Sequence, residues 1–282
     1  MLSEETTHTL NQFVYRVSLP AAILSAFWGI DWSKPEVLQI LLLNIVILIP
    51  FGIGILLLGM LFKLSAEMKA ALFMGALVGN TVYMGFPIGQ GAFGAEGFDF
   101  FLAAAMPHIA LGIIFAELVA ERLTKRKRKL SIYAKESLRN PLVITFFGGI
   151  LLSLFVTGDG VILELRRAVG LIAATASPLA LIGIGAFLYR RLAPLKSGVE
   201  FAIIAIKIIV FPVLMLAIGM FFPQIGKDVI AASAVAASMP VAISVFIITE
   251  RHKVAPAIAA NTILWSTLIS IVTINVFLAF IL

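Results

Sequence analysis

The chain has no cysteine among its 282 residues, which excludes disulfide bonds and thiolate metal sites. Its three histidines, His8, His108 and His252, are too scattered for a recognisable zinc motif. Charged residues are scarce as well: they make up 13% of the chain, against about 25% in soluble proteins. The HExxH and Gly-x-Ser-x-Gly motifs and paired aspartates within apolar runs are also missing. We therefore expect neither an enzyme nor a bound cofactor or metal.

Hydrophobic side chains are abundant instead, at 61% of the chain, and the mean hydropathy is +1.09. This combination indicates a polytopic membrane protein. The first apolar run follows a polar start and lacks a basic n-region, so we expect no signal peptide. The net charge of +6 does not require a nucleic-acid partner, because basic residues of membrane proteins concentrate in cytoplasmic loops.

Apolar windows of about 19 residues predict nine transmembrane helices and an all-α fold. The expected spans are 10–30, 36–62, 68–90, 98–121, 140–158, 166–189, 198–222, 228–249 and 254–282.

The basic residues predict the orientation of these spans. If the polar link at 124–139 is cytoplasmic, the inside loops hold 15 Lys and Arg residues and the outside loops hold four. This bias places the N-terminus in the cytoplasm and the C-terminus outside, in a cell (plasma or inner) membrane. The basic cluster Lys125–Lys129 suits contact with anionic lipid headgroups, although a solvated loop that only sets topology explains it as well.

Two of the expected spans carry residues that break a helix at mid-membrane depth. The uncharged run Ala70–Ala95 contains Gly79–Pro87, with an Asn, a Thr and a Tyr. The run Val229–Thr249 is interrupted at Ala237–Pro240. A pair of interrupted spans in two halves of a chain points to the binding site of a secondary transporter. Freed backbone groups are tolerated there only if they line a cavity or find partners within the protein.

The interruptions recur at similar offsets, which predicts an internal repeat. Pro20 and Pro178 are 158 residues apart, and Pro87 and Pro240 are 153 apart. Spans one to four then pair with spans six to nine, and the fifth span has no counterpart. We expect a four-span unit at 1–123 without its opening helix, a basic cytoplasmic linker at 124–139 and a five-span unit at 140–282. A unit with an odd number of spans is inverted in its second copy.

These motifs resemble the auxin efflux carrier family of membrane transport proteins, over nearly the whole chain. The matching segments are Leu-Asn-Gln-Phe-Val-Tyr at 10–15, Leu-Pro-Ala at 19–21, Gly-Asn-Thr at 79–81, Gly-Phe-Pro at 85–87, Pro240 and Ala-Ala-Asn-Thr at 259–262. The resemblance implies ten spans in two inverted repeats of five, similar to sodium/bile acid symporters, and a homodimer. It also implies two broken helices that cross at Pro87 and Pro240. This chain starts where the second helix of the family would start.

The candidate substrate site is centred on the first broken span. Asn80 and Thr81 offer polar groups at mid-depth that can bind a carboxylate or a freed backbone group, although an Asn can also join helices as a purely structural bond. Pro87 and Pro240 remove helix N–H donors. Half-helix N-termini at such a crossover attract anions, so we expect an anionic substrate.

Three further residues are candidates for the same site, each with a structural alternative. Tyr83 either lines the cavity or anchors a helix at the membrane interface. Ser238 lies next to the second break and is preferred over Ser244, although small hydroxyl residues commonly serve close helix packing. Asn261 is a polar residue within the last apolar run.

Two basic residues are candidates for ion coupling or for attraction of an anion. His108 can carry a coupling proton, because an ordinary histidine titrates near pH 6.5, or it can be a hydrogen-bonded structural residue. Lys207 lies well within an apolar span, where it either faces the cavity or extends to the inner membrane surface.

The sequence therefore predicts a secondary transporter for a small organic anion such as a carboxylate, working by alternating access. The resemblance implies auxin-like acids among the substrates. Neither broken span contains Asp or Glu, which argues against antiport of bare cations and leaves coupling to H⁺ or Na⁺ open. The alternative is a passive channel or a ligand-sensing membrane protein on the same scaffold.

Overall fold

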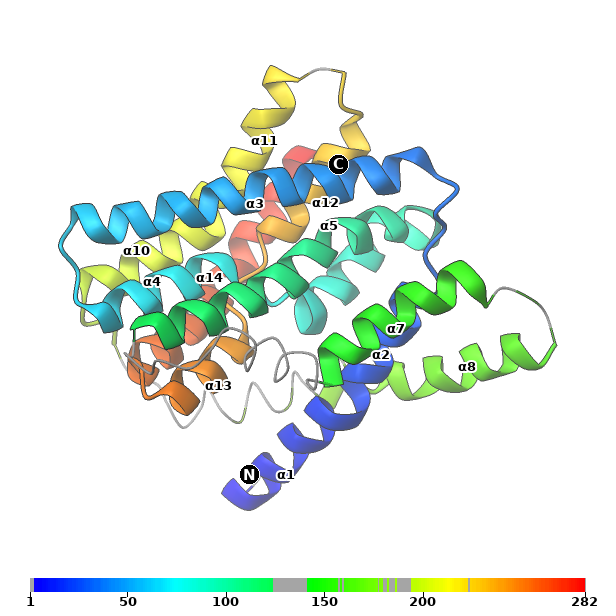
Figure 1. Ribbon diagram of the computed structural model, residues 1–282, viewed down its shortest axis with the longest axis horizontal. Helices are drawn as coiled ribbons and strands as arrows, with labels where there is room; N and C mark the ends of the chain where they lie inside the picture. Colours follow the sequence, from blue (N-terminus) through cyan, green and yellow to red (C-terminus); the bar gives the residue numbers. More distant parts are fainter. Residues whose placement is uncertain are drawn as a thin grey trace.

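The computed structural model describes residues 3–123, 141–156, 158, 160–176, 178, 179, 182, 186, 194–222 and 224–281. These residues form helices and no strand (Figure 1). The helices are α1 (Glu4–Phe13), α2 (Leu19–Trp28), α3 (Pro35–Leu61), α4 (Ala66–Leu77), α5 (Phe86–Leu123), α7 (Pro141–Phe155), α8 (Val161–Ala174), α10 (Gly198–Ala205), α11 (Phe211–Phe221), α12 (Lys227–Ala237), α13 (Ile243–His252) and α14 (Pro256–Ile281). Three π-helical turns join some of them: η1 (Val14–Ser18), η2 (Thr81–Gly85) and η3 (Ile206–Val210).

Within the described ranges, four helical stretches are long and apolar enough to cross a membrane, namely Pro35–Leu61, Gly97–Ala120, Gly198–Phe221 and Pro256–Ile281. Shorter apolar helices cover Val14–Trp28 and Pro141–Phe155. The predictions of an all-helical fold and of a multi-pass membrane protein are confirmed at this level. The count of nine spans and the inverted repeat stay predictions. The linker at 124–139 and much of the span expected at 166–189 lie outside the described residues.

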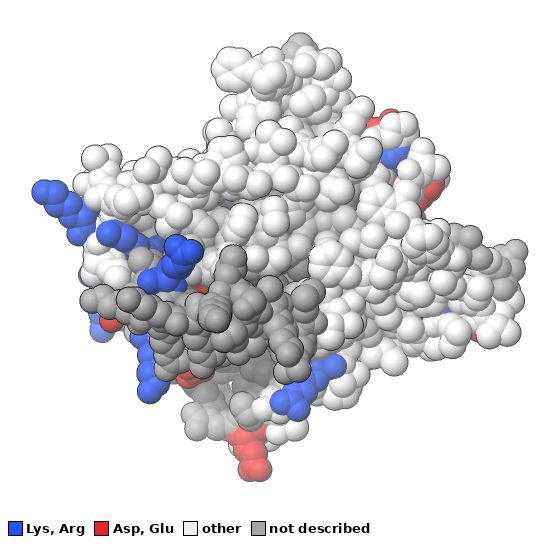
Figure 2. All heavy atoms as spheres, viewed as in Figure 1, with Lys and Arg blue, Asp and Glu red and all other residues white. Residues whose placement is uncertain are grey.

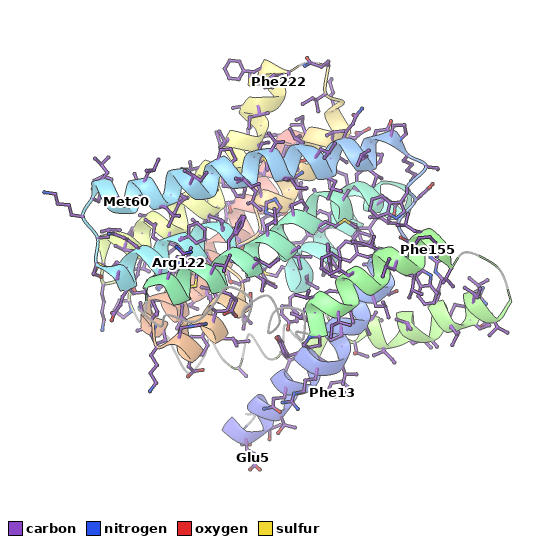
Figure 3. All side chains as sticks on the ribbon, in the orientation of Figure 1. Glu5, Phe13, Met60, Arg122, Phe155 and Phe222 are labelled. Atoms are coloured by element: carbon purple, nitrogen blue, oxygen red, sulfur yellow. The ribbon has the colours of Figure 1, made fainter. Side chains whose placement is uncertain are left out.

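The surface of α3 shows how the molecule suits lipid. Six large apolar side chains repeat along one face of this helix at intervals of three or four residues, and all are exposed: Leu38, Leu42, Val46, Ile49, Ile53 and Leu57. The opposite face, which includes Ile40 and Leu48, is buried against the other helices. Figure 3 shows side chains projecting from both faces of α3. Such an apolar stripe is unfavourable in water and suits a hydrocarbon solvent.

Charged side chains lie mainly at the ends of the helices. Figure 2 shows Lys and Arg gathered at the end of the molecule where α3 turns into α4, while the broad face over α3 carries almost no charge. At the opposite end of α3, Lys34 pairs with Asp99 at 3.1 Å. Charge at the helix ends and apolar surface between them is the distribution that a bilayer requires.

The helices form two groups. The α2–α7–α8 group, which also includes η1, lies to one side in Figure 1. Its contacts include the edge-to-face rings of Phe27 and Phe146 and a hydrogen bond of 3.1 Å from Trp28 Nε1 to the Val156 carbonyl. The crossover group contains α3, α4, η2, α5 and α10 to α14. The Ser18 and Thr175 hydroxyls, 2.9 Å apart, join η1 to α8 within the first group.

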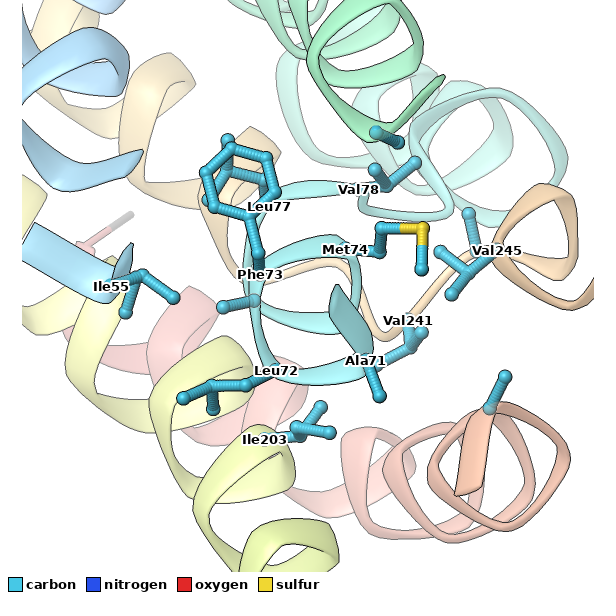
Figure 4. Packing of buried hydrophobic residues seen from close by; sticks show 14 of the residues in the cluster. Ile55, Ala71, Leu72, Phe73, Met74, Leu77, Val78, Ile203, Val241 and Val245 are labelled. Atoms are coloured by element: carbon cyan, nitrogen blue, oxygen red, sulfur yellow. The ribbon is translucent and has the colours of Figure 1, made fainter. Parts of the chain in front are cut away.

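Helices α4 and α12 form the centre of the crossover group. Residues Ala70–Leu77 of α4 and Ala231–Ala237 of α12 are buried throughout. Figure 4 shows how large side chains from neighbouring helices, such as Ile203, surround α4. A Cβ on Gly75 would lie only 2.5 Å from Ile203, so this packing requires a glycine. Small residues allow helices to approach closely in membranes. The close packing around α4 and α12 buries the broken ends of both helices away from lipid.

Candidate functional site

The two broken helices meet at their gaps. The first break, Val78–Asn80, follows α4, and the second break, Ser238–Ala242, follows α12. Gly79 and Val241 form an isolated antiparallel bridge. The Asn80 N–H donates to the Pro240 carbonyl at 2.7 Å, and the Ala242 N–H donates to the Val78 carbonyl at 3.0 Å. The freed backbone groups of each break therefore find partners in the other break.

Helix α14 supports this crossing from one side. The Ser266 hydroxyl, which is fully buried, accepts a hydrogen bond of 3.1 Å from the Val241 N–H. This N–H points away from the bridge and would otherwise be a buried donor without a partner, at a cost of about 1–3 kcal/mol. Ser266 is thus a structural residue of the site, and its position in an apolar span gave no sequence signal for that role.

The expectation that Pro87 marks the first break is wrong. The chain leaves α4 at residue 78, and Pro87 is the exposed second residue of α5, just after η2. Pro20 and Pro212 are likewise second residues of α2 and α11, each just after a π turn. Proline lacks an N–H and clashes with the preceding helical turn, and a wider turn relieves that clash. Pro240, in contrast, lies in the second break as expected.

A cavity adjoins the crossing on the side of the two new helix starts. It contains about 540 Å³ of empty space, part of it open to solvent. Its walls come from the first break and η2 (Val78, Gly79, Asn80, Thr81, Val82 and Tyr83), the second break and α13 (Ala242, Ile243, Ser244 and Ile247), α5 (His108, Ile109 and Ile113) and the α2–α7–α8 group (Tyr15, Leu19, Ile23 and Leu142).

The first residues of both new helices line this cavity. Asn80 precedes η2 and Ala242 precedes α13, and neither side chain caps its helix. The first intrahelical bonds are accepted by the Asn80 and Ala242 carbonyls, from Met84 and Val245. The N–H groups ahead of those donors have no partner within their helix, and they carry the positive end of the helix dipole. Two helix N-termini at one cavity are an arrangement that favours an anion.

The Asn80 side chain adds a polar group to the same wall. It lines the cavity and is 3% exposed. Among the described residues, none forms a hydrogen bond with its amide. Thr81 is less available, because its hydroxyl lies 3.5 Å from the Gly79 carbonyl. A buried amide without a partner is unfavourable unless a ligand or water satisfies it. Asn80 is therefore the side chain best placed to bind a ligand in this cavity.

His108 lines the cavity and is held by a buried polar network. Asn44 Nδ2 donates to the Ile40 carbonyl at 2.9 Å and to the Ser233 hydroxyl at 2.8 Å. Asn44 Oδ1 must therefore act as the acceptor for His108 Nε2, 3.1 Å away. The neutral ring then carries its proton on Nε2. The other nitrogen, Nδ1, is buried without a partner in the described part of the chain.

Lys207 is fully buried within η3, so the prediction that it extends to the membrane surface is wrong. Its ammonium donates to the carbonyl of Ala237, the last residue of α12, at 3.1 Å. It also lies 4.9 Å from the centre of the Phe211 ring. Lys207 does not line the cavity, but it packs against Gly79, which does: a Cβ on Gly79 would lie 3.0 Å from Lys207 Nζ.

The family follows from a comparison over the whole chain. Residues 1–278 match the family model described as membrane transport protein. The chain belongs to this family. The resemblance to the auxin efflux carriers is thereby confirmed. An uncharacterized transporter of Methanocaldococcus jannaschii is 26% identical over 283 residues, which cover 97% of this chain and 89% of the relative. An uncharacterized transporter of Methanothermobacter thermautotrophicus is 20% identical over 285 residues, with the same coverage.

Two of the residues expected at the site of this membrane transport protein lie elsewhere. Ser238 Oγ donates to the Val235 carbonyl at 2.8 Å within its own helix end, and it does not line the cavity. Asn261 Nδ2 donates to Glu200 Oε1 at 2.8 Å, and Asn261 does not line the cavity. Glu200 also accepts from the Lys196 and Ser197 N–H groups at the start of α10. This is a capping box, which the Ser-Gly-Val-Glu sequence at 197–200 carries as a signal.

Two cavity residues were missed from the sequence, and a third was placed correctly. Tyr83 lines the cavity, as one of the two interpretations predicted, and Tyr15 lines it from the α2–α7–α8 group. Ser244, ranked below Ser238 in the sequence, lies in the first turn of α13 and faces the same space. Its place in the first turn of α13 could be predicted only if the start of that helix were known. In the described ranges, no group of three His, Asp or Glu side chains could hold a metal ion.

Proposed function

We propose that this membrane transport protein is a secondary transporter that moves a small organic anion across the cell membrane by alternating access. The observation that carries the proposal is that two helix N-termini and the Asn80 amide, which bonds to none of the described residues, line one cavity at the crossing of the broken helices. Backbone N–H groups and an amide NH₂ suit a carboxylate, which accepts several hydrogen bonds at once.

The opposite wall of the cavity favours an organic anion over an inorganic one. Leu19, Ile23 and Leu142 present aliphatic surface, and Tyr15 adds an aromatic ring. The carboxylate end of a substrate would bind the crossover group, and its hydrocarbon part would contact the α2–α7–α8 group. Movement of one group against the other would then expose the cavity to each side of the membrane in turn.

The membrane orientation is part of the proposal. The 15 to 4 distribution of basic residues over alternate loops places the N-terminus in the cytoplasm and the C-terminus outside. Lys63 and Lys69 at the α3–α4 junction would then face the cytoplasm. Lys207 strengthens attraction of an anion without touching it, because its charge lies behind the cavity wall at Gly79.

Counterflow in proteoliposomes tests the function. Vesicles loaded with an unlabelled carboxylate should accumulate the labelled one, saturably, from a panel of short aliphatic and aromatic acids. A passive channel would give equilibration without trans-stimulation. Uptake of none of these acids by folded protein would overturn the proposal.

Asn80→Ala tests the site. Loss of a hydrogen bond to a charged ligand costs about 1.5–3 kcal/mol, so the apparent Kd for the transported acid should rise about 10- to 100-fold. The matched control is Asn275→Ala, because Asn275 is an exposed amide of α14 whose Nδ2 bonds only to the Ile271 carbonyl in its own helix. Equal affinities of the two variants, both folded, would remove Asn80 from the site.

A further inference from the structure

Lys207 has an unusual position for a lysine in a membrane protein. It is the tenth residue of the 24-residue span Gly198–Phe221, or about 14 Å along the helix from its start at 1.5 Å per residue. Its side chain is 0% exposed. A charged side chain at such depth is rare and marks a functional position by default. Among the residues that the structure describes, no carboxylate pairs with it.

Two groups beside the ammonium present negative potential. Ala237 ends α12, and its carbonyl is one of the last four of the helix, which have no partner within it. Such carbonyls carry the negative end of the helix dipole. The face of the Phe211 ring, one turn further along the same helix, adds a cation–π contact at 4.9 Å.

Gly79 allows the ammonium to reach the crossing itself. A Cβ on Gly79 would lie 3.0 Å from Lys207 Nζ and 3.1 Å from Cε, so the lysine packs directly against the main chain of the first break. Gly79 is also the residue that pairs with Val241 of the second break. The positive charge is thus close to the point where the two breaks meet, on a residue that does not line the cavity.

In carriers with discontinuous helices, unwound carbonyls and half-helix C-termini coordinate Na⁺ at this kind of place. We propose that the Lys207 ammonium is a built-in monovalent cation at the crossing, and that it makes the transport cycle independent of Na⁺. The inference rests on the proposed function for its transport readout and stands on its own for its binding readout. In this proposal the Ala237 carbonyl at the end of α12 binds the ammonium of Lys207, where another carrier would bind a dissolved Na⁺.

Mutation of Lys207 can therefore empty the cation site between the Ala237 carbonyl and Phe211. Lys207→Ala removes the ammonium and three methylene groups, and leaves the Ala237 carbonyl facing a hole beside Phe211. That hole suits a small monovalent cation such as ammonium or methylammonium. Lys207→Met removes the charge and keeps the hole filled with an apolar chain. Lys227→Met is the matched control, because Lys227 is exposed at the start of α12.

The experiment compares the wild type and the three variants in buffers of Na⁺, ammonium, methylammonium or the bulky cation N-methylglucamine. Thermal unfolding of the purified proteins reads cation binding, and carboxylate counterflow reads transport. The wild type and Lys227→Met should give the same Tm and uptake, within twofold, in all four buffers. Lys207→Ala in N-methylglucamine should lose at least tenfold of its uptake and unfold earlier, and ammonium or methylammonium should restore both. Lys207→Met should lose uptake without rescue.

Three results would overturn the inference: wild-type uptake that requires Na⁺, Lys207→Met with wild-type uptake, or folded Lys207→Ala whose Tm is the same in all buffers. If Lys207→Ala folds only in ammonium, the cation site is supported; if it folds in no buffer, Lys207→Met and the wild type decide. Should the wild type move no carboxylate at all, the proposed function fails, while the Tm response of Lys207→Ala to small cations still tests the cation site.

Discussion

The first break and the second break pair with each other, yet different parts of the chain provide their chemistry. The first break ends in Asn80, which lines the cavity, and it contains Gly79, where a Cβ would lie 3.0 Å from Lys207 Nζ. The second break contains Pro240 and Val241 and contributes mainly backbone groups. Lys207 of η3 binds the carbonyl of Ala237, at the end of the preceding helix α12. Two chemically unlike segments can thus share one crossing, because the antiparallel backbone pairing does not depend on the side chains.

The largest expected effect in this comparison comes from a side chain at the first break. Gly79→Leu should abolish carboxylate counterflow and lower the Tm, because its Cβ alone would come within 3.1 Å of two Lys207 atoms and overpacking costs about 1–3 kcal/mol. Gly54→Leu is the control, since a Cβ there meets no atom within 4 Å. Wild-type stability of Gly79→Leu would show that Lys207 does not lie against the first break.

The next largest effect should separate Pro240 from Pro87, the two prolines that the sequence predicted at matching positions of a repeat. Pro240→Ala supplies a free N–H and relaxes the second break, so the free energy of unfolding should fall by about 0.4–1 kcal/mol and uptake should fall severalfold. Pro87→Ala lies on the exposed start of α5 and should change the free energy of unfolding by less than about 0.5 kcal/mol. Chemical unfolding in detergent, followed with counterflow, measures both. Equal effects would mean that the two prolines have the same role after all.

The smallest effect separates two serines of the second broken helix. Ser244→Ala should raise the apparent Kd for the transported acid about fivefold, because a neutral hydrogen bond contributes about 1 kcal/mol. Ser238→Ala should change it less than twofold, because the Ser238 hydroxyl bonds to its own helix. Competition of unlabelled acid against labelled uptake gives both constants. A larger change in Ser238→Ala would place that hydroxyl in the path of the substrate.

The sequence was sufficient for the broad features of the protein. Apolar runs predicted an all-helical, multi-pass membrane protein, the Gly-Asn-Thr and Gly-Phe-Pro segments predicted the family, and the polar residues at 80 and 81 indicated a break that the structure places at the crossing. These features depend on composition and on short motifs, which a single sequence carries.

The details that failed depend on which way a side chain points. In spans that are apolar on all sides, periodicity does not distinguish the buried face from the lipid face. Lys207 was therefore as consistent with the membrane surface as with the core, and Asn261 could not be matched to Glu200, 61 residues away. The sequence predicts the break at Pro87 because a proline usually disrupts a helix. The π turn that accommodates this proline has no sequence signature of its own.

The π turns at 14–18, 81–85 and 206–210 have a consequence for how such a carrier can change. Each turn holds one residue more than an α-helical turn of the same chain, and one residue of an α-helix corresponds to about 100° of rotation. Deleting one residue from 206–210 would restore a regular helix and, because the extra residue is taken up within the turn, would leave the segments beyond it on the same faces. The side chains within the turn, Lys207 among them, would change direction. Insertions and deletions of single residues at these turns, more than substitutions, are therefore the changes that could re-aim the side chains of the turns themselves.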